Sequence, residues 1–269
     1  DSYIMFTALI YMFCSQVTEH MVVTAIDKSH IKEMYCMAKA AYNSYIYNFT
    51  MYELSTLDNN VKNIIKTNHP LIIMREFKFN KYPSHVNISK RHDKGHYAWK
   101  PLIIYEMLQM HNNVIWLDAG TQLTSILSIE FMISKATQHY GIYSMQSSGT
   151  IEDWTHPSMI TYFYENTQIT SVNIHRKNCH AAMLSFTKNN IVKHIMRLWI
   201  KCALNLDCIE PYGASRINHR QDQSALTIII DHIEHIHNIN NGICIDDPYN
   251  TWHTGLQHRG CDTLSLCAR

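Results

Sequence analysis

The chain has 269 residues, and its 23 lysines and arginines nearly balance its 22 aspartates and glutamates. A nucleic-acid partner is not expected, because proteins that bind nucleic acid carry a clustered basic face and no block of like charge occurs here. A chain of this length buries about three quarters of its unfolded surface, which favours one large α/β domain over two small ones.

The eight cysteines are many for an intracellular protein, and none lies in a Cys-x-x-Cys pattern or another zinc-binding spacing. Disulfides formed in an oxidising compartment are therefore expected, although their pairing cannot be read from the spacing. Asn48-Phe-Thr and Asn87-Ile-Ser match the pattern of N-glycosylation acceptors. Both observations agree with a location in the secretory pathway.

The segment 4–13 is almost wholly apolar, but it is about half as long as the ~20 residues of a membrane-spanning helix. It is either the end of a signal peptide or signal anchor that starts before Asp1, or an ordinary buried strand or helix. We therefore divide the chain into a remnant of an anchor or stem at 1–19 and one folded domain at 20–269.

From residue 20 onward, short apolar runs typical of strands alternate with amphipathic stretches typical of helices. This alternation predicts an α/β fold with a mainly parallel, twisted sheet and helices on both faces. Strands are expected at 21–25, 49–54, 71–79, 114–117, 141–145 and 181–186. Helices are expected at 29–42, 57–67, 101–108, 128–139, 157–164, 190–204 and 221–237. The stretch 84–96 and the tail after 237 are expected to be loops, and the stretch 146–153 is small and polar.

Proline marks the start of two of these helices. Pro101 fits the first helical position, because proline lacks the N–H that has no partner there, and Lys100 then lies beside a helix N-terminus. Backbone amides and the helix dipole favour anions at such a place, so Lys100 is a candidate to hold a phosphate oxygen. The alternative is a solvated lysine. Thr155-His156-Pro157 repeats the same start signal.

The apolar run 114–117 ends abruptly in Asp118, which is followed by a turn of small residues. Ligands of open α/β sheets bind outside the carboxyl ends of the strands, so Asp118 can meet a metal ion or a sugar there. The alternative is that Asp118 only caps the next turn.

The densest polar cluster is His219-Arg220-Gln221-Asp222-Gln223-Ser224, at the start of the last expected helix. Asp222 or Ser224 alone would suffice to cap that helix. The additional amides, histidine and arginine exceed what capping needs, and such groups can bind sugar hydroxyls and align a transferred group.

Other chemistries find less support in the sequence. The Gly-x-Ser-x-Gly, Gly-x-x-x-x-Gly-Lys and Gly-x-Gly-x-x-Gly motifs are all missing, so nothing favours a serine nucleophile, P-loop hydrolysis or hydride transfer with a nicotinamide. His232 and His235 share a helix face but have no evident further ligands, so we interpret them as part of a solvated polar face.

Several motifs together resemble one protein family. They are the stretches 82–86, 114–118, 199–204 and 208–213 and the motifs Tyr97-Ala98-Trp99-Lys100-Pro101-Leu102-Ile103-Ile104, Thr155-His156-Pro157-x-Met159 and His219-Arg220-x-Asp222-Gln223-Ser224-Ala225-Leu226. Their order and spacing, from about His20 to Ile230, resemble a large group of animal proteins of uncharacterised function. Those proteins look like lumenal, single-anchor glycosyltransferases of the nucleotide-diphospho-sugar transferase fold.

The resemblance implies a glycosyltransferase-A-like fold and a hexosyltransferase-like activity on a nucleotide-sugar donor bound near Asp118, assisted by a divalent metal, Mn or Mg. It implies a glycan or protein acceptor and a type II membrane protein of the Golgi or endoplasmic reticulum lumen, held through a truncated or missing N-terminal anchor, or else a secreted protein.

Two residues depart from the pattern of the family. The metal strand typically carries Asp-x-Asp, but Gly120 stands at the third position here. The metal site is then completed by a distant residue such as Asp222 or His258, or it is absent. Asn218 replaces a cysteine that the family tends to place before its His-Arg-x-Asp-Gln-Ser run, so a disulfide is not expected there.

The resulting hypothesis gives each candidate residue a role. Asp118 and His258 bind the metal, Lys100 and Arg220 assist the phosphates, and Asp222 with Gln223 contacts the transferred sugar. Thr24 and Tyr52, at the ends of the first two strands, touch the nucleotide, and Glu152 or Asp153 activates the acceptor hydroxyl as a base. The remaining substrate-binding candidates are Trp99, His156 and His219.

Two other functions stay open at this point. A secreted or membrane-anchored binding protein would keep the fold without catalysis, which Gly120 favours. A secreted hydrolase with paired carboxylates is less favoured, because a nearby acid pair cannot be located in the sequence.

Overall fold

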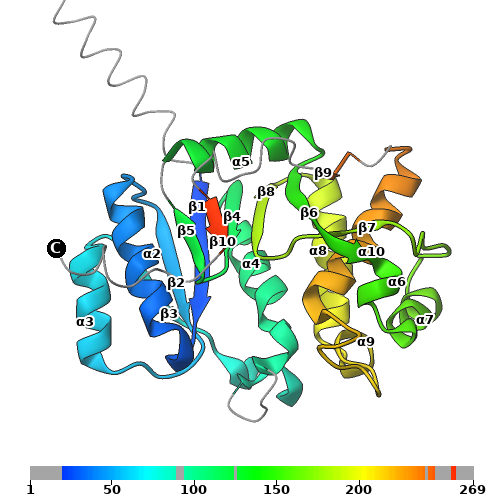
Figure 1. The fold of residues 1–269 in the computed structure, drawn as a ribbon, viewed down its shortest axis with the longest axis horizontal. Helices are drawn as coiled ribbons and strands as arrows, with labels where there is room; N and C mark the ends of the chain where they lie inside the picture. Colours follow the sequence, from blue (N-terminus) through cyan, green and yellow to red (C-terminus); the bar gives the residue numbers. More distant parts are fainter. Residues whose placement is uncertain (1–19, 89–93, 124–125, 240–241, 246–255, 259–269) are drawn as a thin grey trace, which may run out of the picture.

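The computed structural model describes residues 20–88, 94–123, 126–239, 242–245 and 256–258 (Figure 1). The apolar segment 4–13, expected to belong to an anchor, lies outside these residues. Among the helices of the described residues, none has the length and apolar character needed to cross a bilayer.

The described strands form one large sheet, crossing the centre of the molecule, and one small sheet (Figure 1). The order in the large sheet is β3 (Ile73–Glu76), β2 (Phe49–Glu53), β1 (His20–Ile26), β4 (Asn113–Leu117), β8 (Met183–Thr187), β6 (Ile142–Thr150) and β7 (Lys177–Cys179), with β9 (Cys244–Ile245) beside β6. The small sheet pairs β5 (Thr121–Leu123) with β10 (Leu256–His258).

The large sheet is parallel in its N-terminal half and mixed beyond it. Strands β3, β2, β1 and β4 run parallel to one another, whereas β8 is antiparallel to β4 and to β6. All four parallel strands therefore end at the same edge of the sheet. Asp118 follows β4 directly at this edge.

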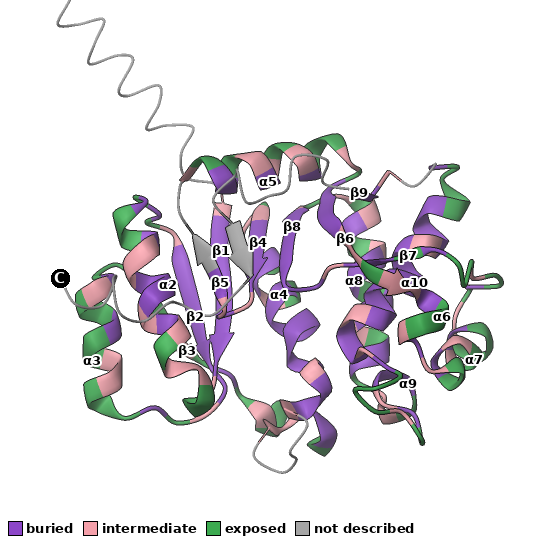
Figure 2. Ribbon diagram, viewed as in Figure 1, coloured by how far each residue is buried: buried purple, intermediate pink, exposed green. Residues whose placement is uncertain are grey.

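Helices cover both faces of the sheet, as the sequence predicts. One face carries α2 (Ile31–Asn43), α3 (Asn59–Asn68) and α5 (Ile126–Gln138), and the other carries α4 (Trp99–Met110), α8 (Asn190–Ala203) and α10 (Gln221–Ile236). Strand β1 serves both layers, because Val22 packs with the first group and Val23 with the second. Figure 2 shows the central strands buried while the helices expose their outer faces. Shorter helices complete the fold: α6 (Ile151–Trp154), α7 (Pro157–Asn166) and α9 (Leu206–Ile209).

Some boundaries differ from the expected ones. Helix α4 begins at Trp99, so Pro101 is its third residue and not its first. The first turn tolerates proline throughout, because none of its N–H groups has a partner within the helix. Strand β6 extends to Thr150, beyond the expected end at Met145, since its second half pairs with the short strand β7.

Two disulfides confirm the expectation drawn from the cysteine content. Cys202–Cys208 joins the end of α8 to α9, and Cys179–Cys244 joins β7 to β9. The second bridge spans 65 residues and ties the strand beyond α10 back to the sheet. Both bridges therefore restrain the C-terminal half of the described chain.

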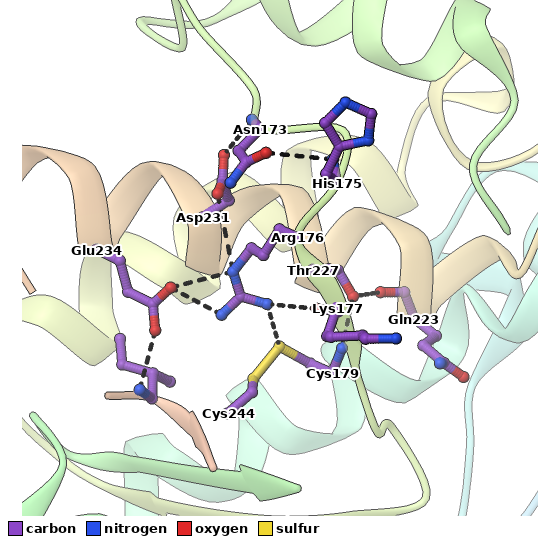
Figure 3. A network of polar contacts seen from close by, with 11 residues as sticks. Asn173, His175, Arg176, Lys177, Cys179, Gln223, Thr227, Asp231, Glu234 and Cys244 are labelled. Atoms are coloured by element: carbon purple, nitrogen blue, oxygen red, sulfur yellow. Dashed lines mark hydrogen bonds and ion pairs between the residues drawn. A yellow bond between two sulfur atoms is a disulfide. The ribbon is translucent and has the colours of Figure 1, made fainter. Parts of the chain in front are cut away.

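A buried arginine connects α10 to the same region (Figure 3). Arg176 donates from Nε and Nη2 to Oε2 of Glu234 at 3.0 and 2.8 Å, and its Nη1 donates to the Lys177 carbonyl at 2.8 Å and to Cys179 Sγ at 3.2 Å. The side chains of Arg176 and Glu234 are only 5% and 6% exposed. This network fixes α10 beside β7 and so helps to place the N-terminus of α10.

We expect the replacement Glu234→Gln to lower the free energy of unfolding by about 3 kcal/mol, because it leaves the Arg176 charge buried without its closest partner. Urea denaturation at pH 7 measures the change. Glu165→Gln on the exposed surface of α7 is the control and should change stability by less than about 0.5 kcal/mol. Equal effects of the two substitutions would show that the buried ion pair is not important for stability.

Candidate active site

Asp118 presents its carboxylate at the carboxyl edge of the parallel strands. Trp116 Nε1 donates to Asp118 Oδ1 at 2.7 Å, and the side chain is 30% exposed. The following turn is closed by the main-chain oxygen of Asp118, which accepts from Thr121 N at 2.8 Å. The carboxylate therefore does not cap that turn.

Lys100 joins Asp118 to Asp222. Its ammonium lies 2.8 Å from Asp222 Oδ2 and 3.2 Å from Asp118 Oδ1, and it donates to the Ala181 carbonyl at 3.2 Å. Burial lowers the pKa of Lys100, which is 3% exposed, but the two carboxylates outweigh burial and raise the pKa above its usual value. Three protein oxygens therefore lie within 3.2 Å of the ammonium.

Three elements place these residues together. Asp118 follows β4, Lys100 is the second residue of α4, and Asp222 is the second residue of α10. A carboxylate in the first turn of α10 is favoured by the helix dipole, whereas an ammonium in the first turn of α4 is not. The two carboxylates compensate Lys100 for that unfavourable position.

Two cavities meet at Asp118. The Asp27 cavity, of about 320 Å³, is lined by residues that include Asp27, His30, Glu33, Lys94, Trp99 and Gly120. The Arg220 cavity, of about 310 Å³, is lined by residues that include Lys100, Ser147, Arg216, Arg220, Asp222 and Gln223. Tyr97 and Asp118 line both cavities. A ligand that filled both would therefore pass over Asp118.

Asp27 is a second carboxylate at the edge of the sheet, directly after β1. It accepts hydrogen bonds from Ser29 N at 2.7 Å and from His30 Nδ1 at 2.9 Å. Burial raises the pKa of Asp27, but the hydrogen bonds from His30 and Ser29 outweigh it and hold the pKa well below the usual range. Asp27 is thus ionised at neutral pH. The sequence analysis missed this residue, although the reasoning applied to Asp118 would have found it.

The Arg220 cavity offers donors to a ligand. The Arg220 guanidinium lies 3.8 Å from the ring centre of Trp154, and Arg216 lies 5.5 Å from that of Tyr97. Within the described part of the chain, neither arginine forms an ion pair with a carboxylate, unlike Arg176. The amide nitrogen of Gln223 is buried at the wall and has no hydrogen-bond partner among the described residues. These groups are suited to an anion and to sugar hydroxyls.

Tyr97, which lines both cavities, is the last residue of an unusual left-handed turn. Lys94, Gly95, His96 and Tyr97 have φ angles of 55°, 64°, 54° and 55°. Trp99 Nε1 donates to the Lys94 carbonyl at 2.9 Å, and Ala98 N donates to the Gly95 carbonyl at 3.0 Å. Left-handed geometry is unfavourable for residues with a Cβ, so these contacts must stabilise it. The turn leads into α4 and sets the position of Tyr97.

Thr24 and Tyr52, the residues expected to touch a nucleotide, line neither cavity. Both are buried, and the Tyr52 hydroxyl donates to Glu106 Oε1 at 2.8 Å. Near the ends of the first two strands, Ala25 and Leu54 reach the Asp27 cavity instead. Ala25 is next to Thr24, and Leu54 lies two residues after Tyr52. Ala25 points to the face opposite Thr24, because successive side chains of a strand alternate between faces. Leu54 shares the face of Tyr52 but lies just beyond the end of β2, nearer the edge of the sheet.

His156 and His219 hold the structure around α7 together. His219 Nε2 donates to the Ile209 carbonyl at 3.0 Å, and its Nδ1 accepts from His156 N at 3.2 Å. His156 is the N-cap of α7, where its ring accepts from Ser158 N. Burial lowers the pKa of His219 to about 4, so its ring is neutral at pH 7. His219 also lines the Arg220 cavity, whereas His156 lines neither cavity.

Glu152 and Asp153, the expected bases, line neither cavity. Asp153 accepts from Thr150 N at 2.8 Å and completes the capping box of α6. The Thr150 hydrogen bonds lower the pKa of Asp153, which weakens it as a base. Glu152 is exposed and lies 3.4 Å from His175 Nδ1. Their position therefore gives no support to a role as base.

The N-cap residue of α10 is Arg220, which makes no capping hydrogen bond with its side chain; Ser224, in the first turn, supports the start of the helix instead. Its hydroxyl accepts from Arg220 N at 3.1 Å and donates to the Trp154 carbonyl at 2.6 Å. Asp222 is then left to bind Lys100. The polar cluster at the start of α10 thus combines a structural residue with residues that line the cavity.

A divalent metal has candidate ligands at Asp118. The described partners of the Asp118 carboxylate, Trp116 and Lys100, both contact Oδ1, which leaves Oδ2 for a metal. In antiparallel register, His258 of β10 lies opposite Thr121, three residues beyond Asp118. Carboxylate oxygens suit Mn²⁺ and Mg²⁺, so the chemistry of Asp118 is compatible with such an ion. Within the described residues there is no group of three or more candidate metal ligands.

Residues 7–105 match a family described as "Protein of unknown function (DUF1647)". No curated protein matches the sequence.

Three of the similar solved structures are glycosyltransferases or their variants. Core-mannan synthase A from Aspergillus fumigatus, in its Mn/GDP form, has a TM-score of 0.55 and 7% identity over 80% of this chain and 70% of its own. The mannosyltransferase Ktr4p from S. cerevisiae in complex with GDP has a TM-score of 0.53 and 8% identity over 80% and 66%. An active-site mutant of LgtC has a TM-score of 0.50 and 12% identity over 90% and 80%. These likenesses show a glycosyltransferase-A-like fold, as predicted.

The stability of the protein should fall between pH 6.5 and pH 4 because of His219. The pKa of His219 is lowered from 6.5 to about 4, so the unfolded state binds more protons in this window. At pH 5, we expect this single group to cost about 2 kcal/mol relative to pH 8. Urea denaturation of the wild type and of His219→Gln across this range measures the contribution. Parallel pH profiles for the two proteins would contradict the prediction.

Gly95→Ala should lower the free energy of unfolding by more than about 1 kcal/mol. An added Cβ would lie 2.2 Å from the Val86 carbonyl oxygen, and the φ of +64° disfavours alanine. Gly120→Ala is the matched control, because no heavy atom lies within 4 Å of its added Cβ. Thermal and urea denaturation should therefore separate the two variants. Equal stability would mean that the left-handed turn relaxes easily.

Proposed function

We propose that this protein is a glycosyltransferase that uses a nucleoside-diphospho-sugar as donor. The observation that carries the proposal is the meeting of Asp118, Lys100 and Asp222 between two cavities at the carboxyl edge of the sheet. Ligands of open α/β sheets bind at such an edge. Two similar structures, one with Mn and GDP and one with GDP, bind this class of ligand.

The Asp27 cavity is suited to the nucleoside. Trp99 and Trp116 line it, with ring centres 6.0 Å apart, and offer aromatic surface to a base. The ionised Asp27 can accept a hydrogen bond from a ribose hydroxyl. The nucleoside would then place its diphosphate over Asp118.

The charges around Asp118 favour a cation. The Asp118 carboxylate lies at the junction of the cavities, and its Oδ2 atom has no partner among the described residues. We propose Asp118 and His258 as ligands of Mn or Mg. A divalent ion there would neutralise the diphosphate as it departs.

The sequence hypothesis assigned Lys100 to the phosphates, and the structure favours another role. Its ammonium is buried and lies 2.8 to 3.2 Å from three protein oxygens, so a phosphate would have to displace one of them. We propose that it positions Asp118 and Asp222. Arg220, and Arg216 beside it, are then the cations available to the diphosphate from the other cavity.

The Arg220 cavity is suited to the transferred sugar. Asp222 lies in its wall, and the amide of Gln223 is free of described partners, so the two can bind sugar hydroxyls. The acceptor, a glycan or a protein, would enter on this side. We do not assign the base to Glu152 or Asp153, because neither reaches the cavity.

We further propose a location in the Golgi or endoplasmic reticulum lumen, or outside the cell. The two disulfides agree with an oxidising compartment. In this proposal, 1–19 contributes to a type II anchor or stem and 20–269 forms the glycosyltransferase-like domain.

One observation favours a second candidate function. Gly120 stands where a second metal-binding aspartate is typical of the fold, which agrees with a binding protein that has kept the fold without catalysis. The two functions differ in turnover, because a binding protein would bind the nucleotide without cleaving the donor.

Nucleotide binding and donor hydrolysis test the proposal together. With Mn²⁺, we expect one nucleoside diphosphate from a panel to raise the melting temperature, because a ligand of the native state stabilises it. Asp118→Asn and Asp222→Asn should each lower kcat/KM for hydrolysis of the matching donor sugar by about 100-fold or more. Chelation of the metal should have a similar effect.

Asp153→Asn is the matched control, since Asp153 lies outside both cavities and should leave hydrolysis unchanged. Stabilisation by a nucleotide without hydrolysis would favour the binding protein. If no nucleotide stabilises the chain with any metal, both functions are wrong.

A further inference from the structure

A third hollow lies between α4 and α8 and shares no residue with the Asp27 or Arg220 cavity. Its volume of about 500 Å³ exceeds that of either cavity and lies within the range of about 300–1,000 Å³ that is typical of ligand pockets. We call it the α4–α8 groove. It is separate from the proposed chemistry, so a ligand bound there would differ from the sugar donor.

The floor of the α4–α8 groove is apolar. Leu108 of α4 and Val192 and Met196 of α8 form it, and these three side chains are buried apart from the face that they turn to the groove. Tyr105 stands at the border, with much of its surface exposed. Water makes no hydrogen bonds with such a floor. An apolar chain that covers the floor removes apolar surface from water, so the hydrophobic effect favours its binding.

The border of the groove is positively charged. Lys188, Lys193 and Arg197 line it and are exposed. Lys193 and Arg197 lie four residues apart on α8 and therefore on one face of the helix. No aspartate or glutamate is among the lining residues, and none of the three cations belongs to an ion pair within the described part of the chain.

We propose that the α4–α8 groove binds a single-chain anionic amphiphile, such as a fatty acid. The acyl chain lies on the floor of Leu108, Val192 and Met196, and the anionic head group pairs with Lys193 and Arg197. An amphipathic peptide helix is less suited, because helix recognition needs a row of anchor pockets along an extended groove. One apolar floor with cations on its border matches one chain with one charged end.

Binding of oleate, measured by displacement of a fluorescent fatty acid below the micellar concentration, tests the proposal. We expect saturable binding of one oleate per chain, and we expect Lys193→Gln combined with Arg197→Gln to weaken it about tenfold, since two charge pairs are lost. Oleyl alcohol, which has no charge, should bind the two proteins equally. Lys32→Gln combined with Lys66→Gln makes the same charge change on α2 and α3 and should have no effect.

The proposal is overturned if the wild type shows no saturable binding of oleate, or if the α8 variant binds oleate as the wild type does. It is also overturned if an acidic amphipathic peptide binds the groove and oleate does not. Circular dichroism checks that each variant is folded. The experiment measures only the binding of oleate, so neither result bears on the proposed glycosyl transfer, which is tested separately.

Discussion

The bridge from Lys100 to Asp118 and Asp222 is the interaction on which the site depends. Each charge would be costly to bury alone, and the two carboxylates would repel each other without the ammonium between them. Because the three residues belong to α4, to the end of β4 and to α10, the bridge also fixes how these elements meet. The same three residues therefore stabilise the fold and set the geometry of the cavities.

The opposite part of α10 is held by different means. Arg176 and Glu234 pair beside the Cys179–Cys244 disulfide, so α10 is attached near both of its ends (Figure 3). A helix held only at Asp222 could pivot, and its first turn would then no longer have a fixed position. The buried network near β7, though far along the chain from Asp222, is in this way part of the support of the site.

The sequence predicts what depends on local pattern. Apolar alternation located the parallel strands and most helices, and the abrupt end of an apolar run located Asp118 at the sheet edge. It could not predict that Lys100 turns inward, because that depends on how three elements pack. The left-handed turn is similar: Gly95 permits positive φ, but Lys94, His96 and Tyr97 adopt it only because tertiary contacts hold them there.

Tyr97 and Asp118 line both cavities, so the occupants of the two cavities affect each other's affinity. A molecule on one side that shifts the Tyr97 ring also reshapes the other side. Thermodynamic reciprocity then requires that each occupant alter the affinity for the other by the same factor. A shared wall of this kind couples the occupants of the two cavities, and the coupling free energy is the same whichever occupant binds first.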